Sequence, residues 1–391
     1  MRETTLGQLL QQCSGSIKTG PFGTILKAAE YSLTGVPVIS VGEVGHGRLR
    51  VGPATPRVER CVTDRLQEYV LRAGDVVFGR KGAVDRSAWV QSVEDGYFLG
   101  SDGIRVRFGD EVDSRFMSYQ FRSATVRQWL TQHAAGSTML SLNQAILERV
   151  PVTVPGLHEQ RAIAEVLGAL DDKIAANTKL VNQLDELLRL HYESLARDGD
   201  SAPLSSLADF VNGKAFTKGA SGTGRVVVRI AELNSGIGNS TVYNDLEVDN
   251  RHLARPGDIL FAWSGSLTVQ RWFRPEAIIN QHIFKVIPAR LSPWVVKGAL
   301  DRKLAEFRSI AADKATTMGH IQRRHLDELV LVPNRAAVAR HDEAMNALWS
   351  RALNAEQESL TLGETRDALL PALMSGKIRV KDAERVVEEV V

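Results

Sequence analysis

The sequence predicts an α/β (α+β) protein in which two similar domains are separated by two long antiparallel helices forming a coiled coil, with a pseudo-twofold internal repeat. Three observations predict this fold. Short motifs occur twice in the same order, strand-like segments lie between them, and two long segments show heptad spacing. The 391 residues are enough for two or three domains of about 100–200 residues. The expected divisions are 1–158 for the first domain, 159–197 for the first long helix, 198–334 for the second domain, 335–375 for the second long helix, and 376–391 for a C-terminal tail.

The repeat rests on three pairs of motifs at nearly constant offset. Their Gly-Asp pairs lie 183 residues apart, their Thr-Met pairs 179 and their last prolines 178. An ordered set of this kind indicates duplication of a whole domain. The pairs are 71–78 with 253–261, 136–139 with 315–318, and 150–155 with 330–333.

Short strand-like segments occupy matching places in the two copies. Glycine and proline bound their apolar runs, as is typical of strands between turns. Segment 103–108 alternates apolar and charged residues, which predicts a half-buried strand with Arg105 and Arg107 on its outer face. The expected strands are 36–41, 75–78, 103–108, 225–230, 257–261 and 278–287, and the expected helices within the domains are 115–130 and 295–312.

The first long helix gives the strongest pattern in the sequence. Residues 159–196 contain no proline and one glycine, and their seam follows 4,3 spacing for more than four heptads. At 1.5 Å per residue such a helix would span about 57 Å. Asn177 and His191 lie on this seam and are expected to set its register. The residues assigned to the helix pair and subunit interface are Ile163, Leu167, Leu170, Ile174, Val181, Leu184 and Leu188 in the first helix, and Met345, Leu348, Leu362 and Leu369 in the second.

Charge alternates along the chain although the net charge is only +2. The two domain segments carry +3 (1–158) and +5 (197–335), and the two helical segments carry −3 each (159–196 and 336–391). This alternation indicates separate modules with different partners.

Motifs for common catalytic chemistry are missing from the sequence. Gly213-Lys214 is followed by alanine, so the phosphate-binding loop of a nucleotide hydrolase is not formed. No dinucleotide fingerprint, amino-methyltransferase motif, nucleophile elbow or zinc-type histidine pair occurs, and the two cysteines form no disulfide framework. No apolar run approaches the roughly 18 residues of a membrane helix. We therefore expect a cytoplasmic protein with neither a catalytic residue nor a metal site.

Basic residues cluster in loops around the predicted strands of both copies. Lysine and arginine at the mouth of a sheet can bind phosphates, and arginine can also contact guanine edges. Each residue alone could equally be a solvated surface charge, so the repetition at matching places carries the functional interpretation. The DNA-binding candidates are Arg48, Arg50, Arg80, Lys81 and Arg86 in the first copy, and Lys214, Lys218, Arg225, Trp263, Ser264 and Arg271 in the second.

These residues resemble a known family. The chain is similar, over essentially its full length, to the specificity (S) subunits of Type I restriction–modification systems. The most specific match is the closing run of the first copy, with Glu159-Gln160-Arg161 entering the long helix. The second copy departs from the pattern around His341-Asp342-Glu343 and lacks Pro-Phe-Gly near Gly213. The other matching segments are 20–23, 35–39, 74–75, 136–139, 142–143, 151–155 and 170–174.

The resemblance implies a non-catalytic DNA-binding subunit for phage defence and DNA methylation. Two target recognition domains would each recognise one half of a bipartite double-stranded DNA target. The helices would set the distance between the halves and dock two methyltransferase subunits and, where present, two restriction subunits. This chain would bind no cofactor. The methyltransferase subunits would carry S-adenosylmethionine, and the restriction subunits would use ATP and Mg²⁺.

Two other functions remain open from the residues alone. One is a coiled-coil interaction scaffold whose two modules bind protein or glycan, which accommodates the modest net charge. The other is a hydrolase with an unfamiliar site, for which Asp75 and Asp258 would be the candidates. Both aspartates are also well placed to be turn residues before strands.

Overall fold

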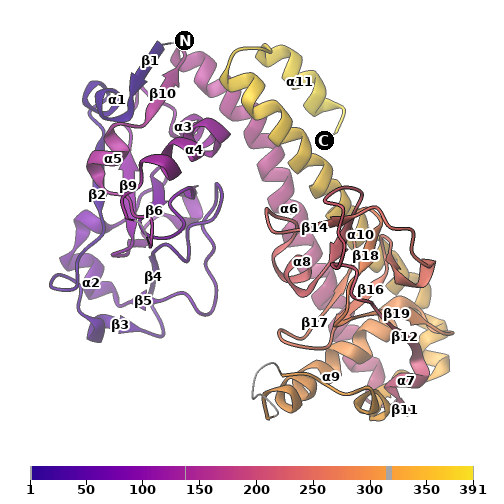
Figure 1. Ribbon diagram of the computed structural model, residues 1–391. Helices are drawn as coiled ribbons and strands as arrows, with labels where there is room; N and C mark the ends of the chain where they lie inside the picture. Colours follow the sequence, from indigo (N-terminus) through magenta and orange to yellow (C-terminus); the bar gives the residue numbers. More distant parts are fainter. Residues whose placement is uncertain (1, 137, 314–318, 391) are drawn as a thin grey trace. The chain divides into compact units, whose positions relative to one another are not determined.

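The computed structural model describes residues 2–136, 138–313 and 319–390, with the side chain of residue 313 left out (Figure 1). The chain forms two compact units. Unit 1 comprises Met1–Asp172 and Leu362–Val391, and unit 2 comprises Lys173–Thr361. Unit 1 is therefore built from two separate stretches of chain, and unit 2 from one.

Two 40-residue helices pass through both units: α6, Leu157–Ala196, and α10, Arg335–Met374. In unit 2 they run antiparallel. Asn177, in the middle of α6, donates a 2.8 Å hydrogen bond to Glu358, whereas Tyr192 near the end of α6 shares a core with Trp349. The predicted fold class, two α/β modules with two long helices, is confirmed.

Strands and helices of the two units follow one plan. Unit 1 contains β1 (Arg2–Thr5), α1 (Leu6–Gln12), β2 (Ser16–Thr19), β3 (Tyr31–Ser32), β4 (Val36–Ile39), β5 (Arg57–Val58), α2 (Arg60–Arg65), β6 (Val76–Gly79), β7 (Ser87–Trp89), β8 (Phe98–Leu99), β9 (Gly103–Arg107), α3 (Ser114–Arg122), α4 (Ala124–His133), α5 (Gln144–Glu148), β10 (Pro151–Val154) and α11 (Val380–Glu388). Unit 2 contains β11 (Asp200–Pro203), α7 (Leu204–Leu207), β12 (Ala208–Asn212), β13 (Arg225–Val228), α8 (Ile230–Ser235), β14 (Val242–Asn244), β15 (Leu253–Ala254), β16 (Ile259–Ala262), β17 (Thr268–Arg271), β18 (Ala277–Ile279), β19 (Ile283–Pro288), α9 (Pro293–Asp313) and β20 (Leu329–Val332).

Sheet topology confirms the internal repeat. The antiparallel order β2-β9-β6-β7 in unit 1 matches β12-β19-β16-β17 in unit 2. A second sheet in each unit contains one parallel pair, β4 with β8 and β13 with β18. The bridge between Val70 and Phe98 in unit 1 corresponds to the pairing of β15 with β18. The motif 315–318 lies outside the described residues, as does residue 137 of its counterpart.

The repeated Gly-Asp pair is a turn that starts a central strand in each unit. Gly74 and Gly257 have φ of 91° and 94°, a backbone conformation that favours glycine. The carboxylate of Asp75 accepts a 2.8 Å hydrogen bond from the backbone N–H of Arg72, and that of Asp258 accepts one of 2.7 Å from Arg255. The sequence motif is therefore explained by turn geometry.

Several expected elements differ from the structure. The helix expected at 115–130 is two helices, because the Ser123 backbone is extended and its hydroxyl caps α4. The strand expected at 278–287 is split into β18 and β19, which belong to different sheets. The expected tail contains the helix α11. Arg105 is buried rather than on an open face, because both faces of β9 are covered.

The motif Glu159-Gln160-Arg161 fixes the start of α6. Buried Gln160 accepts a 2.9 Å hydrogen bond from the backbone N–H of Asp113 and donates one of 2.9 Å to the carbonyl of Pro155. Unit 2 lacks this glutamine, but the indole of Trp294 at the start of α9 donates a 2.8 Å hydrogen bond to Asp342 on α10. A different pair of side chains thus joins the corresponding helices.

The predicted helix seams match the side-chain burial. All the seam residues assigned on α6 and α10 are buried or half-buried, and Asn177 is buried with its bond to Glu358. In unit 2 the long helices close the core, which includes Tyr192 of α6, Phe261 of β16 and Phe307 of α9. Neither long helix, nor any other described helix, is long and apolar enough to cross a membrane.

Truncating the α6 seam in unit 2 should lower its stability. Leu184 is 9% exposed, whereas Leu190 on the same helix is 51% exposed. Leu184→Ala should reduce the free energy of unfolding by about 2–3 kcal/mol, because it removes buried methyl groups and leaves a cavity. Leu190→Ala should cost less than about 1 kcal/mol. Urea unfolding of the full chain measures both, and equal costs would contradict the seam assignment.

Candidate nucleic-acid interface

In each unit, one edge of the four-stranded sheet gathers the loops that carry most of the predicted DNA contacts. Because neighbouring strands are antiparallel, the ends of β2 and β6 lie at the same edge as the starts of β9 and β7. Arg80, Lys81 and Arg86 lie in the loop between β6 and β7. The corresponding edge of unit 2 has Lys214 and Lys218 after β12, and Trp263 after β16. We call these two places the loop edges.

At the loop edge of unit 1, Arg80 lies over an exposed aromatic ring. Its guanidinium carbon is 5.1 Å from the ring centroid of Phe22, which is 54% exposed, and its Nη1 donates a 3.2 Å hydrogen bond to the carbonyl of Ser101. Lys81 forms a 3.0 Å ion pair with Asp102. Arg80 is therefore held in one orientation while most of its five N–H donors form no hydrogen bond to the residues that the structure describes.

The remaining candidates of unit 1 fall into two groups. Arg50 is exposed and Arg86 is half-exposed, and neither forms an ion pair within the described residues. Arg48 instead donates to the carbonyl of Asp171 on α6 and lies 3.5 Å from the carboxylate of Asp172. Arg48 thus links its loop to the long helix.

The loop edge of unit 2 is aromatic where that of unit 1 is cationic. Trp263 occupies the position of Arg80, and its indole donates a 2.9 Å hydrogen bond to Asn212. Its ring lies 5.1 Å from that of His282. Ser264 is buried and its backbone pairs with that of His320, so its predicted contact with DNA is not supported. Lys214 and Lys218 are exposed, whereas Arg225 forms a 3.0 Å ion pair with Glu276.

The prediction for Arg271 is wrong. Its side chain is 2% exposed, and Nε lies 2.8 Å from a carboxylate oxygen of Glu356 on α10. Nη1 lies 3.2 Å from Asp185 on α6, and the guanidinium covers the ring of Trp349 at 4.6 Å. Arg271 ends β17 on the side facing the long helices, so it joins the sheet to them and is unavailable to a phosphate.

Sequence reasoning also missed cations that the structure adds. Arg127 on α4 pairs with Asp85 in the β6–β7 loop, at 2.5 Å from Nη2. Arg323 and Arg324 are exposed in unit 2, just after Ile321, whose N–H donates to the carbonyl of Trp263. This arginine pair directly follows the motif at 315–318, which was the available signal.

Comparison with known proteins finds a family model that matches the first part of the chain. Residues 20–186 match the family model of the Type I restriction modification DNA specificity domain. The type I restriction enzyme MjaIX specificity subunit of Methanocaldococcus jannaschii is 23% identical over 316 residues, covering 70% of this chain and 71% of that protein. The EcoKI specificity subunit of Escherichia coli K12 is 23% identical over 179 residues, 39% of each chain.

A solved structure shows the same fold over nearly the whole chain. The crystal structure of the Type-I restriction-modification system S subunit from M. genitalium aligns with a TM-score of 0.56 at 15% identity, covering 95% of both chains. Residues 20–186 are thus similar to the DNA specificity domain of Type I restriction–modification systems, and the chain shares the fold of a solved S subunit.

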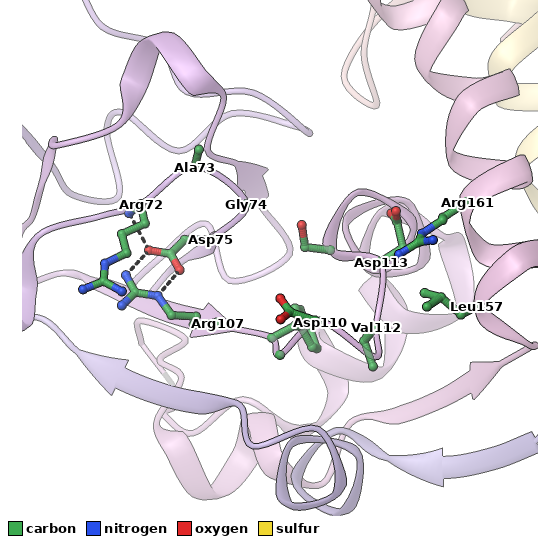
Figure 2. A pocket seen from close by; sticks show the side chains of 13 residues that line it. Arg72, Ala73, Gly74, Asp75, Arg107, Asp110, Val112, Asp113, Leu157 and Arg161 are labelled. Atoms are coloured by element: carbon green, nitrogen blue, oxygen red, sulfur yellow. Dashed lines mark hydrogen bonds and ion pairs between the residues drawn. The ribbon is translucent and has the colours of Figure 1, made fainter.

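At the end of the unit 1 sheet opposite its loop edge, the structure contains a polar cavity of about 470 Å³ (Figure 2). Asp75 lies in its wall. The carboxylate accepts hydrogen bonds of 2.6 and 2.7 Å from Nε and Nη2 of Arg107, besides the one from the backbone of Arg72. In unit 2, Asp258 pairs with Lys285 at 2.8 Å. Both aspartates are tied to turns and cations, which argues against a hydrolytic role.

A second polar cluster joins α6 to its surroundings in unit 1. Asp171 accepts hydrogen bonds of 2.8 Å from the Tyr119 hydroxyl, 2.7 Å from Arg122 and 2.6 Å from Arg366 of α10. Burial alone would raise the pKa of Asp171, but the two guanidinium groups outweigh it and lower the pKa to about 2. Burial and the Asp171 charge raise the pKa of Tyr119, so the phenol stays protonated and donates.

Proposed function

We propose that this chain is the DNA-recognition subunit of a Type I restriction–modification complex and binds a bipartite target, one half at each loop edge. The observation that carries the proposal is the repetition of the loop edge. The same edge of the same sheet presents exposed cations and flat side chains in both units. Two homologous surfaces on one chain are what recognition of two half-sites requires.

The chemistry of the loop edges suits a DNA duplex. Exposed lysine and arginine neutralise phosphates and release counterions, which makes binding strong at low salt and weak at high salt. Arg80, held over Phe22, can direct paired N–H donors to the O6 and N7 atoms of a guanine. Trp263 offers an apolar face instead, which suits contact with a thymine methyl group or a sugar.

The long helices support the rest of the proposal. Because α6 and α10 continue from one unit into the other, helix rather than flexible linker connects the two loop edges. A stiff connection would fix the gap between half-sites. The acidic outer faces of these helices would dock two methyltransferase subunits and, where present, two restriction subunits. Those partners would supply S-adenosylmethionine and ATP with Mg²⁺, and this chain would bind no cofactor.

Mapping methylated adenines in the host genome, with and without this gene, tests the proposal. Loss of methylation at one motif made of two fixed segments and an unspecified gap is the expected result. An unchanged methylation map, together with equal binding to all duplexes at every salt concentration, would contradict it. Purification of this chain from host cells provides a second test. If other proteins copurify with it and methyltransferase subunits do not, the scaffold alternative is favoured.

Arg80→Gln should weaken binding to the methylated motif by about 10- to 100-fold, corresponding to 1–3 kcal/mol for a base-contacting arginine. The loss should concern one half-site, because Arg80 belongs to unit 1 alone. Arg60→Gln is the matched control, since Arg60 is an exposed arginine on α2 of the same unit. Fluorescence anisotropy with duplexes altered in either half measures both variants. Equal losses for the two variants would remove Arg80 from the interface.

A further inference from the structure

His46 lies at the tip of a tight turn that is fixed onto β7 of unit 1. The N–H of Gly45 donates a 3.0 Å hydrogen bond to the carbonyl of Arg48, which closes the turn. The N–H of Gly47 donates a 2.7 Å hydrogen bond to the carbonyl of Ser87. The carbonyl of Gly47 accepts a 3.2 Å hydrogen bond from the N–H of Trp89. Gly47 has φ 88°, and a Cβ there would come within 2.8 Å of the Arg122 guanidinium. The backbone that carries His46 is therefore held against β7, and the residue is exposed at the tip of the turn.

Three arginines lie on segments that meet at this turn. A Cβ at Gly45 would come within 3.0 Å of Arg50 Nε, Arg86 adjoins Ser87, whose carbonyl accepts from Gly47, and Arg127 bonds to Asp85 beside Arg86. Arg50 comes from the far side of the turn, Arg86 from the β6–β7 loop next to Ser87, and Arg127 from α4. Asp85 is the acidic group among them, and both Nε and Nη2 of Arg127 bond to it, at 3.2 and 2.5 Å. The cluster therefore has three cations and one anion around a neutral ring, a net charge of +2.

Other charged groups near the turn are already engaged. Arg122 of α3 is ion-paired with Asp171, and the Glu43 carboxylate accepts a 3.1 Å hydrogen bond from the backbone N–H of Ser40. Arg50 and Arg86 have no ion pair within the part of the chain that the structure describes. The unpaired positive charge of the cluster thus resides on Arg50 and Arg86, while His46 is neutral.

We propose that His46, Arg50, Arg86 and Arg127 form a proton-linked binding site for a backbone phosphodiester of duplex DNA, in which His46 takes up a proton as the phosphate binds. This inference rests on the proposed function, since it assigns one phosphate contact of the unit 1 loop edge. A phosphate between Arg50 and Arg86 would bring the net charge of the cluster from +2 to +1. The same anion would offset part of the repulsion that the arginines exert on a proton at His46, so protonation of the ring would become easier.

The charges around His46 in the protein without DNA decide whether DNA affinity rises or falls with pH. Partial burial of the ring and the charges of Arg127, Arg86 and Arg50 lower the pKa of His46 below 6.5, and Asp85 opposes them only in part. Burial raises the pKa of Asp85, but the hydrogen bonds and charge of Arg127 outweigh burial and keep this pKa lowered. The charge of Asp85 therefore stays constant near neutral pH. A bound phosphate raises the pKa of His46. Affinity is then highest at low pH and is lost as pH rises through the pKa of the complex.

The test uses the full chain and a fluorescein-labelled 30-base-pair duplex of random sequence, because phosphate contacts do not require the target. At constant ionic strength, the wild-type Kd should rise about threefold to tenfold between pH 5.5 and 8, as uptake of up to one proton permits. His46→Gln should flatten this rise. His158→Gln should leave it intact, since His158 is an exposed histidine at the start of α6. Arg86→Gln should lower the slope of log Kd against log salt by about one unit.

Nuclear magnetic resonance of the His46 ring gives a direct second readout. Its pKa should rise when the duplex is added, and inorganic phosphate alone at equal phosphate concentration should leave it unchanged. A response to inorganic phosphate but not to duplex would overturn the assignment to a DNA phosphodiester. Duplex binding whose pH dependence is the same in wild type and His46→Gln would overturn the inference while leaving the proposed function standing. Failure to bind any duplex at low salt would instead remove the proposed function itself.

Discussion

Asp171→Asn should destabilise unit 1 by about 3–5 kcal/mol, the cost of removing one partner from a buried ion-pair cluster. The carboxylate is the shared anion of Arg122 and Arg366, and it also accepts the hydroxyl of Tyr119. Its side chain is only 11% exposed. Asparagine keeps the shape but leaves the largely buried Arg122 without its charge partner, and Arg366 with only the exposed Asp367, so much of the desolvation penalty is uncompensated.

The same substitution should change the acid sensitivity of unit 1. The folded pKa of Asp171 is about 2, below the usual 3.8. Its contribution to stability is therefore fully present above about pH 4 and is lost as pH falls toward 2, with a size of about 2 kcal/mol. Asp171→Asn should lack this component, so its stability deficit relative to wild type should shrink in acid.

Asp172→Asn is the matched control for this prediction. Asp172 is the next residue on α6 and pairs with Arg115 at 2.8 Å, but its side chain is 63% exposed. Exposed pairs contribute about 0–1 kcal/mol, so the control should be nearly neutral. Hydrogen–deuterium exchange in urea, followed on peptides of unit 1, measures both variants. Equal effects for the two aspartates would contradict the central role of Asp171.

Arg271→Met should destabilise unit 2 by about 3 kcal/mol or more. Methionine replaces much of the aliphatic volume but leaves the carboxylates of Glu356 and Asp185 together without their cation, and Trp349 loses its cation–π contact. Burial already raises the pKa of Glu356 despite Arg271. In the variant this pKa should rise further, so the deficit should grow as pH increases from 5 to 8.

Arg255→Met provides the control for Arg271. Arg255 belongs to the same unit and forms a 2.9 Å ion pair with Glu276, but its side chain is 53% exposed. We expect a loss below about 1 kcal/mol that depends little on pH. Urea unfolding at pH 5, 6.5 and 8, followed by exchange in unit 2 peptides, compares the variants. A pH-independent loss at Arg271 would contradict the proposed coupling to Glu356.

Local patterns predicted the long helices and the repeat well, because those features depend on residues close in sequence. The heptad spacing placed α6 at 159–196 and α10 from 335, against Leu157–Ala196 and Arg335–Met374 in the structure. The break between α3 and α4 was missed because it depends on one serine that can occupy either a helix interior or a cap. Periodicity cannot separate those roles.

Site residues were harder to predict, because their roles depend on what lies opposite in space. Arg80 and Arg271 look alike in the sequence, each near a repeated strand. One lies over exposed Phe22, and the other is buried against carboxylates 86 and 85 residues away. His46 and Arg127 gave no local signal at all, since the cluster forms only when the turn, the β6–β7 loop and α4 come together. Distant contacts of this kind are decided by tertiary packing.

The discontinuous sequence of unit 1 has a consequence for biosynthesis. A ribosome makes residues 1–172 first, but the stretch 362–391 that completes this unit follows only after all of unit 2. Unit 2 is continuous and can finish folding as soon as it has emerged, so the order of completion should be the reverse of the order of translation. Until Arg366 arrives, the nascent N-terminal segment must wait with Asp171 missing one of its two arginines.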